Sequence, residues 1–561
     1  VRPMTAARST TRADIAAARN EFEAFQVVVT GPASKVSARA SALEGPGRIE
    51  GVRLFREDLI DVKQLSALDG ELGLWPDALV PDVDDVVGEK RNAFPFDVKD
   101  GESRAIWAEV HVPADAKPGT YTGTVTIESA EGVAEIPVTL TVWDFELPST
   151  SSMRTSFILS YGTTRAAHRK DGDEESALRA RYGQLGLDHR ISLTSLADDG
   201  RHNDLDNVAK FYGPLLDGTA PTTLEGAKLT TFKYVGDRTS VPEHARWAEY
   251  FRSRGWFDRL YDYTCDEPPL TCTWDEIKVR AKAVHDADPE FQTLVTTHVQ
   301  LADEKGVRDS IDIMVPVINF MDDRPGQELA GDQTAAYGSF LAQGGQKELW
   351  TYQSCMSHGC GGTVNFGNPS ASDHYYTGWP TYMIDSSAVR SRAQEWLSFL
   401  HGATGELYWE TTMAYTHDAW SNQWDFSGNG DGTLFYPGLP SRIGGQTDIP
   451  VASIRLKMIR EGMEDYEYLK LLADSGDAEL AKRLAREVFP NAYSTDIDPT
   501  VLMNARAQLA KRIVELRGGT VVTAPEGAAP AGPAAPGGSE AVSTTGWTGA
   551  QPPSSARRAG R

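Results

Sequence analysis

The stretch WFDRLYDYTCDEP, residues 256–268, decides how the centre of this chain is interpreted. Its aromatic and apolar start predicts a short strand, and two adjacent carboxylates, Asp266 and Glu267, follow where that strand ends, directly before a proline. Adjacent like charges repel each other. The two residues therefore lie either in solvent or in a site that uses their repulsion for chemistry.

Eight runs of this kind occur between residues 153 and 415, separated by longer amphipathic or irregular stretches. Two of the intervening stretches, residues 273–288 and 387–403, predict helices. Strands that alternate with helices predict a (β/α)8 TIM-like barrel, in which residues 229–234 are the weakest strand. The eight runs are residues 154–162, 187–196, 229–234, 256–264, 292–300, 311–321, 347–355 and 405–412.

The N-terminal part has a different pattern. Short runs rich in Val, Thr and aromatic residues are separated by Gly, Pro and Asp. In residues 121–127, every second residue is Thr, and the residues between are Tyr121, Gly123, Val125 and Ile127. This pattern predicts a β-sandwich with one wet face on that strand. We divide the chain into a β-sandwich domain (1–147), a catalytic barrel (153–450), a helical region (451–517) and a tail (518–561).

The last two segments follow from spacing and composition. Residues 450–475 carry apolar residues at helical spacing with dense charge between them, and residues 499–519 predict a second helix ended by two glycines. We expect Arg455, Arg460, Glu464 and Asp465 to form structural ion pairs. The tail is rich in Ala, Pro, Gly and Ser and has hardly any core-forming residue, so it is expected to be disordered.

Charge and hydropathy exclude several functions. The 55 Lys and Arg against 79 Asp and Glu give a net charge of −24, which repels phosphate backbones and argues against a nucleic-acid partner. No apolar run approaches the roughly 18–20 residues of a membrane span. Residues 1–14 have no apolar core of a signal peptide, although removal of a leader is compatible with Val1. The sequence predicts no cofactor.

The four cysteines form two close pairs, Cys265 with Cys272 and Cys355 with Cys360. We interpret them as two short disulfides, which places the protein outside the cytoplasm as a secreted or extracytoplasmic protein. Two alternatives remain: free cytosolic thiols, and a zinc site that includes His358. Neither pair has the CxxC spacing typical of zinc, so we predict no metal.

In a barrel the chemistry lies at the carboxyl ends of the strands, where Asp266 and Glu267 fall. Crowding raises the pKa of one of two carboxyl groups, and glycoside cleavage commonly needs one charged and one protonated group. Aromatic rings that stack on the C–H faces of a sugar also cluster near the predicted strand ends. We therefore predict substrate contacts from Trp409, Tyr352, Tyr263, Tyr408 and Tyr161, with Asp431 in a glycine-rich turn as a further candidate.

Several longer motifs resemble glycoside hydrolase family 123. They are AARNEFEAFQVVVTG (17–31), VHVPADAKPGTYTGTVTI (110–127), CDEP (265–268), YMIDSSAVRSRAQEWLSFLHGATGELYWETT (382–412), NGDGTLFYPG (429–438) and IPVASIRLKMIREGMEDYEYLKLL (449–472). The last two are the most specific. The resemblance implies a β-sandwich, a (β/α)8 barrel and a helical C-terminal part, and an exo-acting β-N-acetylgalactosaminidase.

The resemblance also implies roles for the carboxylates. Asp266 would orient the 2-acetamido group of the substrate and stabilise the oxazolinium ion, and Glu267 would protonate the leaving oxygen and then activate water. Cys265 beside this pair departs from the expected pattern, and a disulfide there would fix the loop or narrow the cleft. Two alternatives stay open: a glycosidase on a different glycan, with exo or endo action, and a carbohydrate-binding protein without activity.

Overall fold

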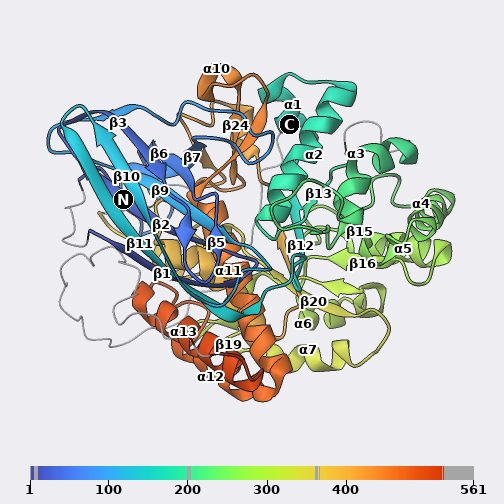
Figure 1. Cartoon of the computed structure of the whole chain (residues 1–561). Helices are drawn as coiled ribbons and strands as arrows, with labels where there is room; N and C mark the ends of the chain where they lie inside the picture. Colours follow the sequence, from blue (N-terminus) through green and yellow to red (C-terminus); the bar gives the residue numbers. More distant parts are fainter. Residues whose placement is uncertain are drawn as a thin grey trace.

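The computed structural model describes residues 2–4, 11–198, 204–360, 364, 367–520 and 522. The N-terminal sheets lie on one side, a ring of strands and helices lies on the other, and the C-terminal helices lie below and between them (Figure 1). The predicted disordered tail falls, apart from residues 518–520 and 522, outside the described residues. No helix in the described ranges is long and apolar enough to cross a membrane.

The N-terminal region is built from two sheets. Apolar residues from both meet in one core that includes Val27, Val36, Ile106, Tyr121 and Leu140. The alternation in residues 121–127 is largely confirmed, because Tyr121, Val125 and Ile127 are buried and Thr122 is exposed, but Thr126 is buried too. One sheet contains β1 (Ala13–Arg19), β3 (Ala33–Ala40), β4 (Leu43–Glu44), β5 (Arg48–Ile49), β8 (Phe96–Val98), β10 (Gly119–Ser129) and β11 (Gly132–Glu146), and the other β2 (Glu21–Thr30), β6 (Arg53–Val62), β7 (Gly73–Pro81) and β9 (Ser103–Val112).

The central region is an eight-stranded parallel sheet in the order β13-β12-β21-β20-β17-β16-β15-β14. The segments directly before the two end strands are linked, since the Thr230 N–H donates to the Ser192 side chain Oγ at 2.7 Å, so the sheet is nearly closed. Every strand overlaps one of the eight predicted runs. They are β12 (Arg154–Ile158), β13 (Leu193–Thr194), β14 (Phe232–Lys233), β15 (Leu260–Cys265), β16 (Gln292–Val295), β17 (Ile313–Met314), β20 (Glu348–Tyr352) and β21 (Gly405–Tyr408).

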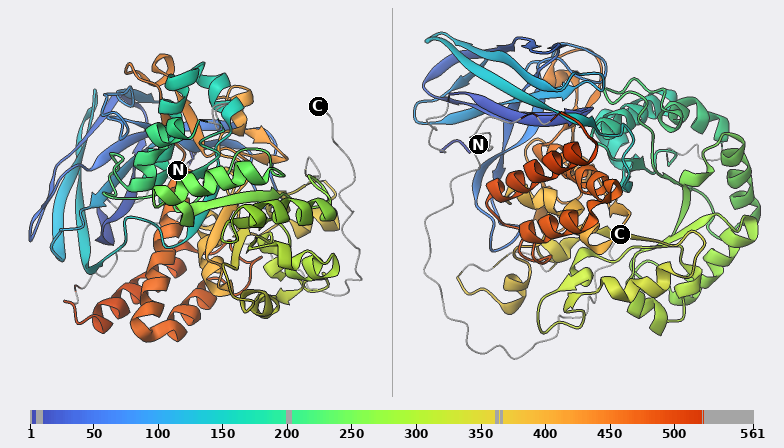
Figure 2. Two further views of the ribbon diagram at one scale, coloured as in Figure 1. Left: turned by 90° about the vertical axis from the view of Figure 1, so that its right-hand side faces the viewer. Right: turned by 60° about the horizontal axis from the view of Figure 1, so that its bottom comes forward.

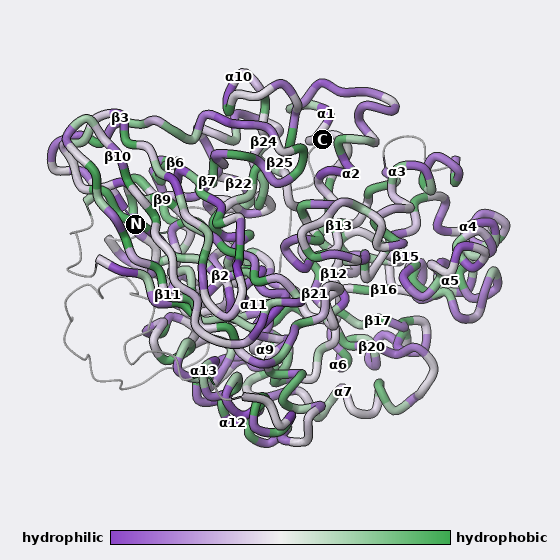
Figure 3. The backbone as a smooth tube through the Cα atoms, viewed as in Figure 1, coloured by the Kyte–Doolittle hydropathy of each residue, from purple (hydrophilic) through white to green (hydrophobic). Residues whose placement is uncertain are grey.

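Helices separate these strands along the chain and form an arc around them in the right view of Figure 2. Central strands such as β16 contain mainly hydrophobic residues, whereas outer helices such as α4 contain many hydrophilic ones (Figure 3). The predicted helix at 273–288 begins at a capping box formed by Thr273 and Glu276. The helices are α1 (Tyr161–His168), α2 (Gly172–Asp188), α3 (Leu205–Asp217), α4 (Val241–Ser253), α5 (Trp274–Ala287), α6 (Val299–Glu304), α7 (Thr334–Leu341), α8 (Ala371–Tyr375) and α9 (Ala393–His401).

The C-terminal part is helical, as predicted, with α11 (Ile454–Leu472), α12 (Ala478–Val488) and α13 (Pro499–Leu516). Most charged side chains of α11 are buried between the N-terminal sheets and the ring of strands. Arg455 pairs with Asp77 of β7 at 2.8 Å, and Lys457 pairs with Glu109 of β9 at 3.0 Å. Arg460 also pairs with Glu109, and Glu464 pairs with Arg190 at 3.1 Å. The ion pairs expected on this helix are therefore present, and they lie in the interior.

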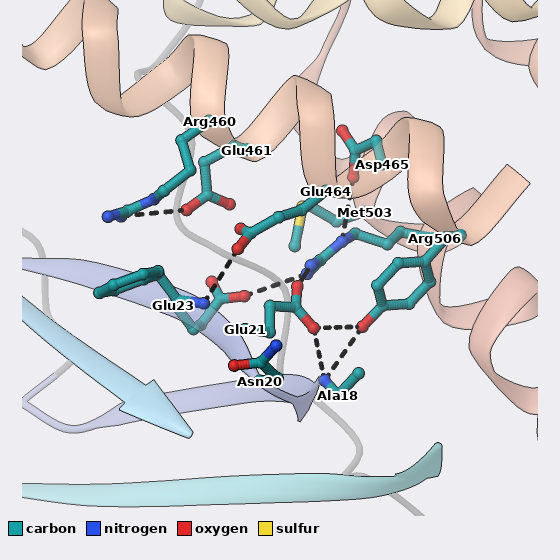
Figure 4. A network of polar contacts seen from close by, with 12 residues as sticks. Ala18, Asn20, Glu21, Glu23, Arg460, Glu461, Glu464, Asp465, Met503 and Arg506 are labelled. Atoms are coloured by element: carbon teal, nitrogen blue, oxygen red, sulfur yellow. Dashed lines mark hydrogen bonds and ion pairs between the residues drawn. The ribbon is translucent and has the colours of Figure 1, made fainter. Parts of the chain in front are cut away.

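One guanidinium joins three segments of the chain. Arg506 of α13 lies between Glu21 and Glu23 of β2 and Asp465 of α11, with the Nη1–Glu23 Oε2 and Nε–Asp465 Oδ1 distances both 3.0 Å (Figure 4). Asp465 also pairs at 2.8 Å with Arg392, which directly precedes α9. Removal of one partner from such a set leaves a buried charge without compensation.

Arg506→Met should therefore lower the free energy of unfolding by about 3–5 kcal/mol, because Glu21 and Glu23 lose the guanidinium between them, while Asp465 keeps Arg392. Arg483→Met is the matched control, since Arg483 on α12 pairs with Glu487 in solvent and should contribute less than about 1 kcal/mol. Urea unfolding followed by tryptophan fluorescence and circular dichroism measures both. Equal midpoints for the two variants would contradict the inferred importance of burial.

Candidate active site

Asp266 and Glu267 directly follow β15, at the carboxyl end of the parallel sheet. Neighbouring side chains of a regular strand point to opposite faces, but here the register shifts between Tyr263 and Cys265, and Glu267 has a φ of 42° in the left-handed region. The backbone thus leaves the pleat at the carboxylates. Both side chains are consequently free to lie at the same end of the sheet.

A buried tyrosine bonds each carboxylate. The Tyr263 hydroxyl donates to Asp266 Oδ1 at 2.7 Å, and the Tyr352 hydroxyl donates to Glu267 Oε1 at 2.6 Å. Both tyrosines belong to the apolar cluster formed by residues of β15, β16, β17, β20 and β21. The structure thus brings these two predicted residues to the carboxylates, and a direct contact of either with substrate stays a prediction.

Thr296, one residue beyond β16, links the two carboxylates. Its hydroxyl donates to Asp266 Oδ1 at 2.9 Å and accepts from the Glu267 N–H at 2.5 Å. The sequence interpretation missed this residue. Its only signal was a polar Thr296-Thr297 pair within the predicted run 292–300.

The surroundings of Glu267 favour its protonated form. Burial raises the pKa of Glu267 above its ordinary value, and the neighbouring Asp266 raises it further, whereas the hydrogen bond from Tyr352 lowers it. The pKa of the Tyr352 hydroxyl is itself raised by burial, so this hydroxyl remains a donor. A protonated carboxyl group beside an acceptor carboxylate is suited to proton donation.

Both predicted cysteine pairs are formed, Cys265–Cys272 and Cys355–Cys360. The first loop holds the backbone of Asp266, whose N–H donates to Thr271 Oγ1 at 3.1 Å. The second loop carries His358, the residue of the zinc alternative, whose Nε2 lies 3.1 Å from Asp431 Oδ2. Within the described ranges no group of three or more His, Cys, Asp or Glu is placed to hold a metal ion.

The remaining predicted contacts lie near β21. Trp409 is half-buried and donates from Nε1 to Asp431 Oδ1 at 3.0 Å. Tyr408 and Asp431 are only 1% and 2% exposed, and the Gly432 N–H donates to the Tyr408 hydroxyl at 2.9 Å. These two residues support Trp409 from the interior, and their contact with substrate stays a prediction. Tyr161 begins α1, but its side chain lies outside what the structure describes.

Paired carboxyl groups at the carboxyl ends of parallel strands are typical of glycoside hydrolases. A model of the glycoside hydrolase 123 N-terminal domain matches residues 66–129, and a model of the glycoside hydrolase 123 catalytic domain matches residues 245–472. The chain belongs to glycoside hydrolase family 123 and is a glycosidase by family.

One solved structure of the same family agrees on the fold. A family 123 glycoside hydrolase from Clostridium perfringens is similar over 91% of this chain and 94% of its own, with a TM-score of 0.60 and 12% identity. A putative α-galactosidase from Bacteroides fragilis (11% identity, 82% and 80% covered, TM-score 0.23) and a β-D-glucuronidase from Dictyoglomus thermophilum (11%, 80% and 68%, 0.26) are too distant to carry an argument. No curated protein matches the chain.

Reduction of the two disulfides should lower glycosidase activity while the melting temperature changes by only a few degrees. Such short loops contribute about 2–3 kcal/mol each in the chain-entropy model, but Cys265 adjoins Asp266. The double variant Cys355→Ser with Cys360→Ser distinguishes the effects of the two disulfides. It keeps the Cys265–Cys272 disulfide, so reduction should still lower its activity. Mass spectrometry should show pairings 265–272 and 355–360; four free thiols, pairing between the loops or stoichiometric zinc would each contradict this assignment.

Proposed function

We propose that this protein is a retaining exo-β-N-acetylgalactosaminidase that uses the 2-acetamido group of its substrate as the nucleophile. The observation that carries the proposal is the contrast between two adjacent carboxyl groups. Two hydroxyls donate to Asp266, whereas burial and the neighbouring charge raise the pKa of Glu267. Family membership supports the reaction class.

In the first step the acetamido oxygen attacks the anomeric carbon as the glycosidic bond breaks. Asp266 orients the acetamido group and stabilises the positive charge of the oxazolinium ion, and Glu267 donates its proton to the leaving oxygen. In the second step Glu267 takes a proton from water, which opens the oxazolinium ring at the anomeric carbon. Two displacements at one carbon retain its configuration, and no covalent bond to the enzyme forms.

Adjacency of the two residues suits this chemistry. The acetamido group and the leaving oxygen are attached to neighbouring carbons of one sugar ring, so the groups that serve them must lie close together. Thr296 and the two tyrosines fix the carboxylates relative to each other, which reduces the entropy lost on reaching the transition state. We also propose that the nearly closed sheet acts as a (β/α)8 barrel with this pair at its mouth.

The setting of the activity is part of the proposal. The Clostridium perfringens enzyme hydrolyses glycolipid glycans. This activity supports a glycan or glycoconjugate as the substrate here. Two disulfides support a location outside the cytoplasm, where they persist.

A panel of chromogenic β-GalNAc, β-GlcNAc, β-Gal and β-Glc substrates tests the proposal. We expect turnover of the acetamido sugars alone, because the plain sugars lack the internal nucleophile. Glu267→Gln should lose about 10²–10⁴-fold in rate on poor leaving groups and less on good ones, since these need little protonation. Turnover of plain galactoside at a comparable rate contradicts substrate assistance, and sugar binding without turnover on any glycan favours a carbohydrate-binding protein.

The pH dependence follows from the contacts of Glu267. An acid must start protonated, so kcat/KM should fall as the pH rises through the pKa of Glu267. Tyr352→Phe removes the hydrogen bond that lowers this pKa, so the alkaline limb should move to higher pH even though the maximal rate drops. Tyr263→Phe is the matched control, because its hydroxyl bonds Asp266 and the limb should stay in place. A limb that Tyr352→Phe leaves unmoved would argue against Glu267 as the acid.

A further inference from the structure

Phe426 lies at the tip of a hairpin beside Trp409. The hairpin consists of β22 (Trp424–Asp425) and β23 (Gly428–Asn429), so its loop has two residues, Phe426 and Ser427. Both have positive φ values, 45° and 71°, as in a type I′ turn. Asn-Gly is the favoured pair at such positions, and a bulky aromatic residue in the left-handed region is an outlier.

The Phe426 ring is not there to fill the core, because the residue is 62% exposed. Its ring centroid lies 4.7 Å from that of Trp409, with the planes inclined by 59°. Trp409 is fixed on its other sides, since its Nε1 donates to Asp431 and its ring lies so close to Gly432 that a Cβ there would clash. The two rings form one rigid aromatic edge that faces solvent.

Neighbouring segments hold the hairpin in this position. Gly428 packs against His358 and Met383 without space for a side chain. The Asn429 N–H donates to Ser66 Oγ at 2.8 Å, and its side-chain amide donates to the Gln64 carbonyl at 2.9 Å, both from the N-terminal region. Asp385 accepts from the Ser66 hydroxyl in turn. An unfavourable backbone that the surroundings enforce, with an exposed aromatic ring at its centre, indicates function.

Topology places this edge across from the carboxylates. Trp409 directly follows β21 as Asp266 follows β15, and these strands stand four places apart in the order of eight in either direction. Parallel strands end on the same side, so the aromatic edge and the carboxylate pair lie at the same end of the sheet, four strands apart. An exo-acting enzyme buries the terminal sugar that it releases. Protein residues on the solvent side of that sugar therefore contact the leaving group.

We propose that Phe426 is a specificity-determining residue that stacks on the first sugar of the leaving group. The inference rests on the proposed glycosidase function and extends it, because it assigns the hairpin to the part of the glycan beyond the cleaved bond. The apolar C–H face of a sugar ring fits the exposed face of an aromatic side chain, and such contacts are sensitive to ring geometry.

The test compares two substrates with alkyl leaving groups and the same reacting sugar: methyl β-N-acetylgalactosaminide and a disaccharide with terminal β-linked N-acetylgalactosamine. Phe426→Asn should lower kcat/KM on the disaccharide by roughly five- to tenfold, mainly through KM, as expected for loss of one aromatic contact. The methyl glycoside should be unaffected, because its leaving group is too small to reach the rim. Phe426→Trp keeps an aromatic ring at this position, so its kcat/KM on the disaccharide should stay near that of the wild type.

Stability separates this role from a structural one. Asn tolerates the left-handed backbone, so Phe426→Asn should melt no lower than the wild type while it loses disaccharide activity. Val133→Ala removes a side chain that is 67% exposed at the tip of the β10–β11 hairpin, and it should change neither rate. Equal losses on both substrates, or no loss on the disaccharide, would overturn the assignment. A wild-type protein that hydrolyses neither substrate would instead refute the proposed function, and the present inference with it.

Discussion

The buried ion pairs of α11 are the constraint on which the rest of the structure depends. Charged groups that leave water need partners at close range, and α11 finds them in β7, β9, α13 and the segment before α9. Residues from opposite ends of the chain therefore have to be in place together, as Arg506 with Glu21 shows. The N-terminal sheets and the ring of strands are joined through this helix, so their relative position is a property of the charges as well as of apolar packing.

The relative position of the N-terminal sheets affects the carboxyl end of the parallel strands. The N-terminal loop around Ser66 bonds Asn429 and Asp385, and thereby supports the hairpin that carries Phe426. The N-terminal region thus contacts the segment that carries the hairpin beside Trp409. Elsewhere the barrel supplies its own support, because Tyr263, Tyr352 and Thr296 hold the two carboxylates from the strands below.

The carboxylates show how environment divides work between similar groups. Asp266 and Glu267 differ by one methylene and one position in the chain, and burial together with the neighbouring Asp266 raises the pKa of Glu267. Both residues lie inside the loop closed by Cys265 and Cys272, and Glu267 has a positive φ. Their side chains meet different partners, Tyr263 for Asp266 and Tyr352 for Glu267. Local backbone geometry, supported by the interior of the sheet, thus gives two adjacent carboxyl groups different environments.

The sequence by itself determined the central strands and both cysteine pairs. Period and composition identified all eight central strands, the CDEP motif located the carboxylates, and short cysteine spacing predicted both disulfides. These features are local, so a short window contains them. Only the tertiary structure decided that the charges of α11 are buried, that Thr296 joins Asp266 to Glu267, and that Phe426 lies beside Trp409. The physical reason is that burial and partnership depend on contacts outside any short window, from Trp409 with Phe426 to Arg455 with Asp77 at the other end of the chain. A charged or aromatic residue has the same letter in the sequence whether it contacts solvent or a partner.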